Sequence, residues 1–156
     1  MLSEQDQTKF WANVEKTSTC WNWTGATRYD GYGRVYVGSA KHYVHRIAWE
    51  LTNGPIPDGK YLDHKCHNTS CVNPQHLRPV TAKENAEHLT GSYKNSKTGI
   101  RGVFWNKGKQ KYTARVAHNK KIHHAGYFAD IKDAEAAAVA KRLELFTHND
   151  ADRAAS

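Results

Sequence analysis

The stretch from Leu62 to Leu77 concentrates side chains that could carry out chemistry. Cys66, Cys71 and His76 are separated by four intervening residues each time, and Cys20 is the remaining one of the three cysteines. Thiolates and an imidazole are the ligands that hold structural zinc tetrahedrally. A loop with so few hydrophobic residues needs a bound metal ion to hold its conformation. We therefore predict one Cys3His zinc site, the alternative being three free cysteines and a surface histidine.

The same stretch offers hard oxygen ligands and a base. Asp63 supplies a carboxylate and Asn85 an amide oxygen, a pairing that suits Mg²⁺ with several waters better than zinc, and Mn²⁺ would fit the same oxygens. His64 follows Asp63 on an expected strand and points to the opposite face if the strand is regular. It is therefore better placed as a general base than as a third ligand. The alternative is an aspartate, a histidine and an asparagine that occur here by chance.

Short helices and strands are expected to position these groups. Ser3 or Asp6 could cap a helix that carries Phe10, Trp11 and Val14 on one face. Aromatic and β-branched runs separated by glycine-rich turns predict strands at 21–24, 32–37 and 41–44, followed by a helix over 45–52 and a strand from Tyr61. Thr81 begins a further helix, with Glu84 completing a capping box.

The C-terminal part has a simpler pattern. Three alternating runs, 101–105, 111–117 and 121–128, predict an antiparallel meander, and from Asp130 an alanine-rich helical stripe packs across it. Val103 and Val116 are expected to face the helix. The sequence does not decide which face of the sheet meets a ligand. The polar segment 90–99 has the composition of a linker. We predict an α+β chain divided into a first domain 1–89, the linker 90–99, a second domain 100–148 and a frayed tail 149–156.

Positive charge is concentrated in the second half. Residues 1–88 hold 10 basic and 9 acidic side chains, whereas residues 89–156 hold 13 and 6. The segment 94–121 contains nine lysines or arginines and no acid. Such a stretch indicates contact with a nucleic acid, the alternative being a solvated basic face.

Composition excludes several classes of protein. With 156 residues, 38% hydrophobic and 24% charged, the chain has the composition of a folded protein and not of a disordered or collagen-like one. It has no apolar run near the roughly 20 residues of a membrane helix. The first ten residues lack the layout of a secretion signal, so we expect a reducing cytoplasm, that of the host cell if the gene belongs to a phage, and no disulfide framework.

The motif DHKCHNTSCVNPQHL with Asn85, preceded by CWNWTGA, GYGRVYV, HRIAWE and GPIPDG, resembles the HNH and His-Cys box (ββα-metal) nucleases, in particular phage and intron homing endonucleases. The resemblance implies a zinc-stabilised ββα-metal fold. It implies that His64 is the general base, that Asn85 and Asp63 bind one catalytic divalent ion, and that zinc is held at the positions of four residues, Cys66, Cys71, His76 and the distant Cys20. Many HNH proteins have Asn at the position of His76, and the histidine fits the zinc-bearing branch.

These roles together imply hydrolysis of a phosphodiester by a one-metal mechanism, with neutral His64 taking a proton from the attacking water. Arg34, in GYGR, is a further hypothesis, because an arginine fork matches the oxygens of a scissile phosphate. A surface strand residue is the alternative for Arg34.

The segment from Ser96 to Glu144 resembles the APETALA or ethylene-response-factor DNA-binding domain, on the residues RGV, Tyr112, Gly126-Tyr-Phe128 and the alanine-rich helix. Members place the sheet in the major groove, where arginine can read guanine edges. The third strand has His124 where plant members have tryptophan. The expected DNA contacts, to bases or to phosphates, are Arg101, Trp105, Lys107, Lys109, Lys111, Arg115, Lys120 and Lys121.

The sequence thus predicts a homing-type, site-recognising endonuclease of double-stranded DNA. A monomer would nick one strand, whereas a homodimer would cut both. One alternative is a non-catalytic DNA-binding protein that keeps the finger as a scaffold. A second is an RNA-binding protein, which basic charge and aromatic residues would serve equally well.

Overall fold

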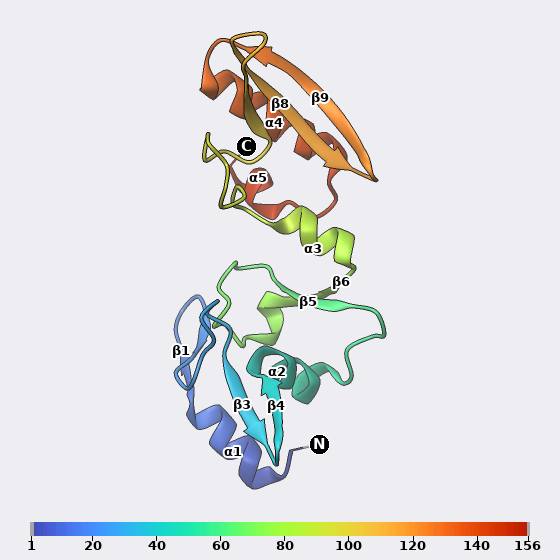
Figure 1. Ribbon diagram of the computed structural model, residues 1–156. Helices are drawn as coiled ribbons and strands as arrows, with labels where there is room; N and C mark the ends of the chain where they lie inside the picture. Colours follow the sequence, from blue (N-terminus) through green and yellow to red (C-terminus); the bar gives the residue numbers. More distant parts are fainter. Residues whose placement is uncertain (1, 156) are drawn as a thin grey trace. The chain divides into compact units, whose positions relative to one another are not determined.

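A computed structural model describes residues 2–155 and divides the chain into two compact units between Ala82 and Lys83 (Figure 1). All of its sheets are small and antiparallel and alternate with helices, so the mixed α and β class predicted from the sequence is confirmed. Within residues 2–155, no helix has both the length and the apolar character that crossing a membrane requires.

The first unit is built from three two-stranded sheets and short helices. In chain order its elements are α1 (Glu4–Ala12), β1 (Val14–Lys16), β2 (Trp21–Trp23), β3 (Arg34–Val37), β4 (Ala40–Tyr43), α2 (Val44–Asn53), β5 (Tyr61–His64), the 3₁₀ turn η1 (Pro74–His76) and β6 (Leu77–Val80). The strands pair as β1 with β2, β3 with β4 and β5 with β6. The predicted strands and the helix over 45–52 are present, whereas β1, η1 and β6 carry too few residues to give a pattern.

The first helix is shorter than predicted. Ser3 caps it by accepting a hydrogen bond from the backbone N–H of Asp6, but the helix ends at the C-cap Asn13. The expectation that Val14 lies on this helix is wrong. Val14 instead pairs with Trp23 across β1 and β2, because the chain turns between Thr17 and Cys20 to form that ladder.

The core of the first unit packs α1, β2 and α2 together. Phe10, Trp23, Val44, Ile47 and Ala48 are buried in one cluster. Gly33 closes the cluster at the start of β3, where a Cβ atom would lie 2.5 Å from Cγ2 of Val44 and 2.7 Å from Cδ1 of Trp23. A larger residue would therefore force the core apart.

The second unit contains α3 (Ala82–His88, from Lys83 on), β7 (Val103–Asn106), β8 (Lys111–His118), β9 (Lys121–Phe128), α4 (Ile131–Leu145) and α5 (Asp150–Ala154). The three strands form the predicted meander in the order β7-β8-β9. Asp130 caps α4 by accepting from the backbone N–H of Lys132. Ala134 and Ala138 pack against Val103 and Ala114, and such small side chains let the helix lie close to the sheet.

Two boundaries differ from those expected. The tail from residue 149 forms α5 instead of fraying, because the Arg142 guanidinium donates to both carboxylate oxygens of Asp152, at 2.6 and 2.8 Å. The division between units falls after Ala82, the first residue of α3, whereas the predicted first domain extends to residue 89. Glu87 of α3 is buried and accepts hydrogen bonds from the backbone N–H groups of Thr147 and His148, so the helix packs with the C-terminal elements.

Candidate metal centre and active site

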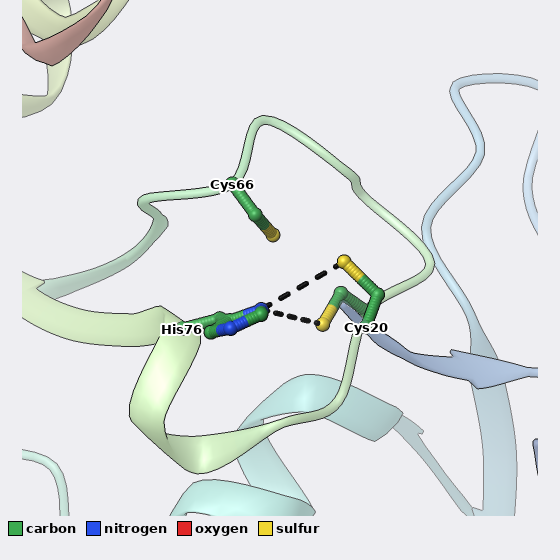
Figure 2. Close-up of side chains that lie close together, drawn as sticks. Cys20, Cys66 and His76 are labelled. Atoms are coloured by element: carbon green, nitrogen blue, oxygen red, sulfur yellow. Dashed lines mark hydrogen bonds between the residues drawn. The ribbon is translucent and has the colours of Figure 1, made fainter. Parts of the chain in front are cut away.

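The four predicted zinc ligands lie together in the first unit (Figure 2). Their donor atoms are all within 4.8 Å of one another. Nδ1 of His76 is 3.7 Å from Sγ of Cys20 and 3.6 Å from Sγ of Cys71. A tetrahedral zinc with ordinary Zn–S and Zn–N bonds separates a sulfur from a nitrogen by about 3.6 Å. The donor set therefore fits one zinc ion.

Backbone hydrogen bonds bring these ligands together. The loop after β5 crosses β2, where the N–H of Val72 donates to the carbonyl of Trp21 at 2.7 Å and the N–H of Trp23 donates to that of Ser70 at 2.9 Å. These two bonds place Cys71 beside the strand that follows Cys20. Asn73 caps η1 through the N–H of Gln75, which sets the turn that carries His76.

The thiols of this cluster are adapted to a cation. Burial raises the pKa of Cys66 to about 12, and burial also raises the pKa of Cys71 above its ordinary value. Thiolates close together without a cation would repel one another, which agrees with the raised pKa of Cys66 and Cys71. A bound zinc ion favours the thiolate form, and its binding free energy then contributes to folding.

His64 ends β5 and is connected directly to this loop. Its side chain is buried, and its Nε2 lies 3.0 Å from the carbonyl oxygen of Cys71. A carbonyl oxygen only accepts hydrogen bonds, so Nε2 carries the proton and Nδ1 of the neutral ring keeps its lone pair. Burial lowers the pKa of His64, and the Cys71 carbonyl and the Asp63 carboxylate oppose this shift. His64 is thus held in the tautomer that a base acting through Nδ1 requires.

Aromatic rings surround His64 on its inner side. The ring centroids of His45 and Tyr32 lie 4.9 and 5.7 Å from that of His64. Tyr43 in turn packs against both of these rings, and its hydroxyl accepts a hydrogen bond from Arg28 at 2.6 Å. Sequence reasoning missed this cluster. HRIAWE marks an amphipathic helix, but nothing in that motif states what its histidine packs against.

Asp63 lies in an ion pair across the β5–β6 hairpin. Its Oδ2 is 2.9 Å from Nε of Arg78, the residue directly opposite it in the register, and the carboxylate is buried. Alternation along β5 directs Asp63 and His64 to opposite faces, as the sequence predicts. Arg78 was not predicted, because the pairing depends on a strand, β6, that the sequence does not signal.

Two other predicted residues lie elsewhere. Asn85 is on α3 in the second unit, and its role as a ligand remains a prediction. Arg34 begins β3 and lines a cavity of about 430 Å³ with Phe10, Asn13 and Trp23. None of the rings around His64 lines this cavity, so contact between Arg34 and a scissile phosphate also remains a prediction.

The strand register separates the two faces of the second unit's sheet. Phe104 and Tyr127 both pair with Thr113, on the face opposite the helix-facing pair Val103 and Ala114. Phe104 is 37% exposed and Tyr127 is 42% exposed, although sequence reasoning named neither as a DNA contact, and Thr113 between them is buried. We call the surface formed by Phe104, Tyr127, Arg115 and Lys109 the open face.

Cations cover the aromatic rings of the open face. The guanidinium of Arg115 lies 4.2 Å from the ring centroid of Phe104, and Nζ of Lys109 lies 4.6 Å from that of Tyr127. Trp105 alternates with Phe104 and so belongs to the other face of the sheet. Its ring centroid lies 4.8 Å from that of Tyr112, the residue with which it pairs. The remaining predicted contacts are exposed at the strand ends and turns, namely Lys107, Lys111, Lys120 and Lys121.

Arg101 is half-buried and makes hydrogen bonds within the second unit, and its contact with DNA remains a prediction. Its guanidinium donates to the backbone carbonyls of Ala86, Glu87 and Leu89 at the end of α3, and it lies 5.4 Å from the ring of Phe146. The last carbonyls of a helix lack partners within the helix, and an arginine side chain can supply them. Arg101 thus caps α3.

Comparison with known proteins identifies the class of the first unit. A family model described as HNH endonuclease matches residues 42–87, which run from β4 through the metal cluster to α3. No solved structure matches the chain. The matched segment contains the pair Asp63 and His64 together with three of the four clustered ligands.

The relatives in curated collections are phage proteins. The chain is 37% identical over 78 residues to protein 7.7 of Escherichia phage T7, covering 50% of this chain and 60% of that protein. It is 36% identical over 83 residues to T7 protein 2.8, covering 52% and 56%. With T7 protein 3.8 the identity is 32% over 93 residues, covering 60% and 74%. The chain thus spans somewhat more than half of the first two relatives. Its segment 42–87 is similar to the HNH endonuclease family.

Proposed function

We propose that the protein is a metal-dependent endonuclease of double-stranded DNA, of the homing type, that acts in the cytoplasm of a phage-infected host. The observation that carries this proposal is the hydrogen bond from Nε2 of His64 to the Cys71 carbonyl, which leaves Nδ1 free to accept a proton. The match of residues 42–87 to the HNH endonuclease family supports the same activity.

In this mechanism Nδ1 of His64 takes a proton from a water molecule that attacks the phosphorus in line with the leaving 3′ oxygen. Asp63 and Asn85 would hold the catalytic divalent ion, Mg²⁺ or Mn²⁺, since carboxylate and amide oxygens suit such hard cations. When bound, this ion neutralises charge on the reacting phosphate. Arg78 pairs with Asp63 and so fixes the position of that carboxylate. Arg34 is proposed to contact the phosphate.

Zinc at Cys20, Cys66, Cys71 and His76 would have a structural role. It would tie the loop after β5 to the start of β2. Because Cys71 also provides the carbonyl that orients His64, the zinc cluster supports the base through one residue.

The second unit is proposed to bind the DNA through its open face. Residues 83–156 hold 14 basic and 8 acidic side chains, and Arg115 and Lys109 lie over aromatic rings on that face. An arginine in this setting can read guanine edges, while lysines at the turns contact phosphates. The resemblance to the APETALA domain agrees with sheet-mediated binding. A monomer would nick and a homodimer would cut both strands.

The test is incubation of the purified protein with supercoiled phage or host DNA in Mg²⁺, Mn²⁺ or EDTA, beside His64→Ala and the control His42→Ala. His42 is an exposed histidine on β4. We expect metal-dependent nicked or linear product from the wild type and His42→Ala, and none from His64→Ala. DNA binding without cutting in every metal would support a non-catalytic binding protein. Preferential binding of RNA of the same sequence would support RNA recognition.

A further inference from the structure

The ring of His45 packs directly against that of His64. Their centroids are 4.9 Å apart with an interplanar angle of 61°, and both side chains are buried. Tyr32 lies 5.4 Å from His45 and 5.7 Å from His64, so the three rings form one cluster. His45 is in the first turn of α2, whereas His64 is at the end of β5.

One hydrogen bond does not fix an imidazole ring completely. The bond from Nε2 to the Cys71 carbonyl locates one atom of His64 but leaves rotation of the ring about that bond. The terminal torsion of a histidine side chain has broad minima, so packing must select the orientation. The rings of His45 and Tyr32 supply this packing, and they thereby set the direction in which Nδ1 points.

His45 is also suited to this position because it stays neutral. Burial, together with the nearby charges of His64 and Arg46, lowers its pKa to about 3. The positive end of the α2 dipole opposes a proton here as well. A second cation 4.9 Å away would oppose the charge that His64 gains when it takes a proton, whereas neutral aromatic rings favour it.

A hydrogen bond from Nδ1 does not explain why residue 45 is a histidine. Nδ1 of His45 is buried and has no hydrogen-bond partner among residues 2–155. An unpaired buried nitrogen lowers the stability of the fold. His45 instead contacts the rings of Tyr32, Tyr43 and His64.

We propose that His45 is a positioning residue that, together with Tyr32, holds the His64 ring in the orientation needed for proton transfer. This inference rests on the proposed function, because it concerns the base of that reaction. It predicts that the ring of residue 45 matters for catalysis and that its nitrogen atoms do not.

The experiment compares His45→Ala, which removes the ring, with His45→Phe, which restores it. Ile47→Ala is the matched control, since Ile47 lies on the same helix and in the core cluster around Trp23. Single-turnover cleavage of supercoiled DNA and DNA affinity in EDTA are measured in the full-length protein. ¹⁵N spectra of labelled histidine, with His64 assigned by His64→Gln, report the tautomer of His64 without any catalysis.

We expect His45→Ala to cleave about 100-fold more slowly, the loss that a displacement of about 1 Å can cause, with unchanged DNA affinity. His64 should then show a mixture of tautomers. His45→Phe should cleave at close to the wild-type rate and show the single Nε2-protonated form of His64. Ile47→Ala should retain both properties of the wild type.

An unaltered rate and His64 spectrum in His45→Ala would overturn the proposal. So would a His45→Phe protein that is as slow as His45→Ala. A wild-type protein that never cleaves would instead overturn the proposed function, and the His64 spectra would still decide whether residue 45 orients the ring.

Discussion

Different interactions stabilise each of the two units of the chain. The first, up to Ala82, contains all three cysteines, four of the five tryptophans and a nearly balanced set of 9 basic and 7 acidic side chains. The second has no cysteine, and alanine and valine side chains pack between its helix α4 and its sheet. The ion pair of Arg142 with Asp152 holds its C-terminal helix α5 against α4. We therefore expect the stability of the first unit, which contains His64, to depend on a metal, and the stability of the more basic second unit not to.

Removal of zinc should have the largest effect and should act on the first unit alone. Chelation, or Cys66→Ser, takes away a ligand set whose binding free energy is about 10–16 kcal/mol in zinc-finger peptides. We expect the fluorescence of the tryptophans of the first unit to show unfolding while the amide signals of β7–β9 persist. Restoring zinc should refold the chelated protein. Loss of both units together would contradict the separation.

Gly33→Ala should destabilise the first unit by about 1–3 kcal/mol, because the added Cβ would enter the space between Val44 and Trp23. Gly91→Ala is the control, since a Cβ there would have no neighbour within 4 Å. Denaturant unfolding followed by tryptophan fluorescence measures the difference. Equal midpoints for the two variants would show that the core tolerates the larger residue.

Arg115→Ala should weaken DNA binding about tenfold without changing the stability of the first unit, because Arg115 lies on the open face over Phe104. Lys132→Ala, on the exposed side of α4, should bind as the wild type does. Binding titrations at several salt concentrations measure this, and the wild-type affinity should fall steeply with salt. Tight, salt-independent binding by Arg115→Ala would exclude the open face as the DNA surface.

The smallest effect is expected for the loss of stability of the second unit at low pH. The hydrogen bonds from Arg142 lower the pKa of Asp152 below its ordinary value. A carboxylate with a lowered pKa stabilises the fold above its unfolded pKa, near 4, and this stability is lost as the pH falls through the folded pKa. Asp152→Asn should cost about 1 kcal/mol at neutral pH and flatten the loss in acid. An unchanged acid profile would mean that Asp152 contributes no such stability.

Parts of the site could be predicted because the sequence carries local signals. Cys66, Cys71 and His76 have regular spacing, and Cys20 is the single cysteine left to join them, so the cluster could be anticipated. The meander and α4 could also be anticipated, because their alternation and helical period are long.

Other parts depend on register and tertiary packing. The pairing of Asp63 with Arg78 requires β6, a strand of four residues with no alternating pattern. His45 and Tyr32 reach His64 only through the fold. Arg101 belongs to a basic stretch that suggests DNA contact, yet the carbonyls at the end of α3 take its guanidinium. Charge along a sequence does not distinguish a helix cap from a ligand contact.

The central claim is that the first unit cuts and the second unit binds. The most direct test measures cleavage rate at saturating enzyme and DNA affinity in EDTA for wild type, His64→Ala and Arg115→Ala. The account predicts that His64→Ala binds normally but cleaves at least 100-fold more slowly, and that Arg115→Ala binds weakly but cleaves normally once saturated. Cleavage by His64→Ala at the wild-type rate, at equal affinity, would contradict it.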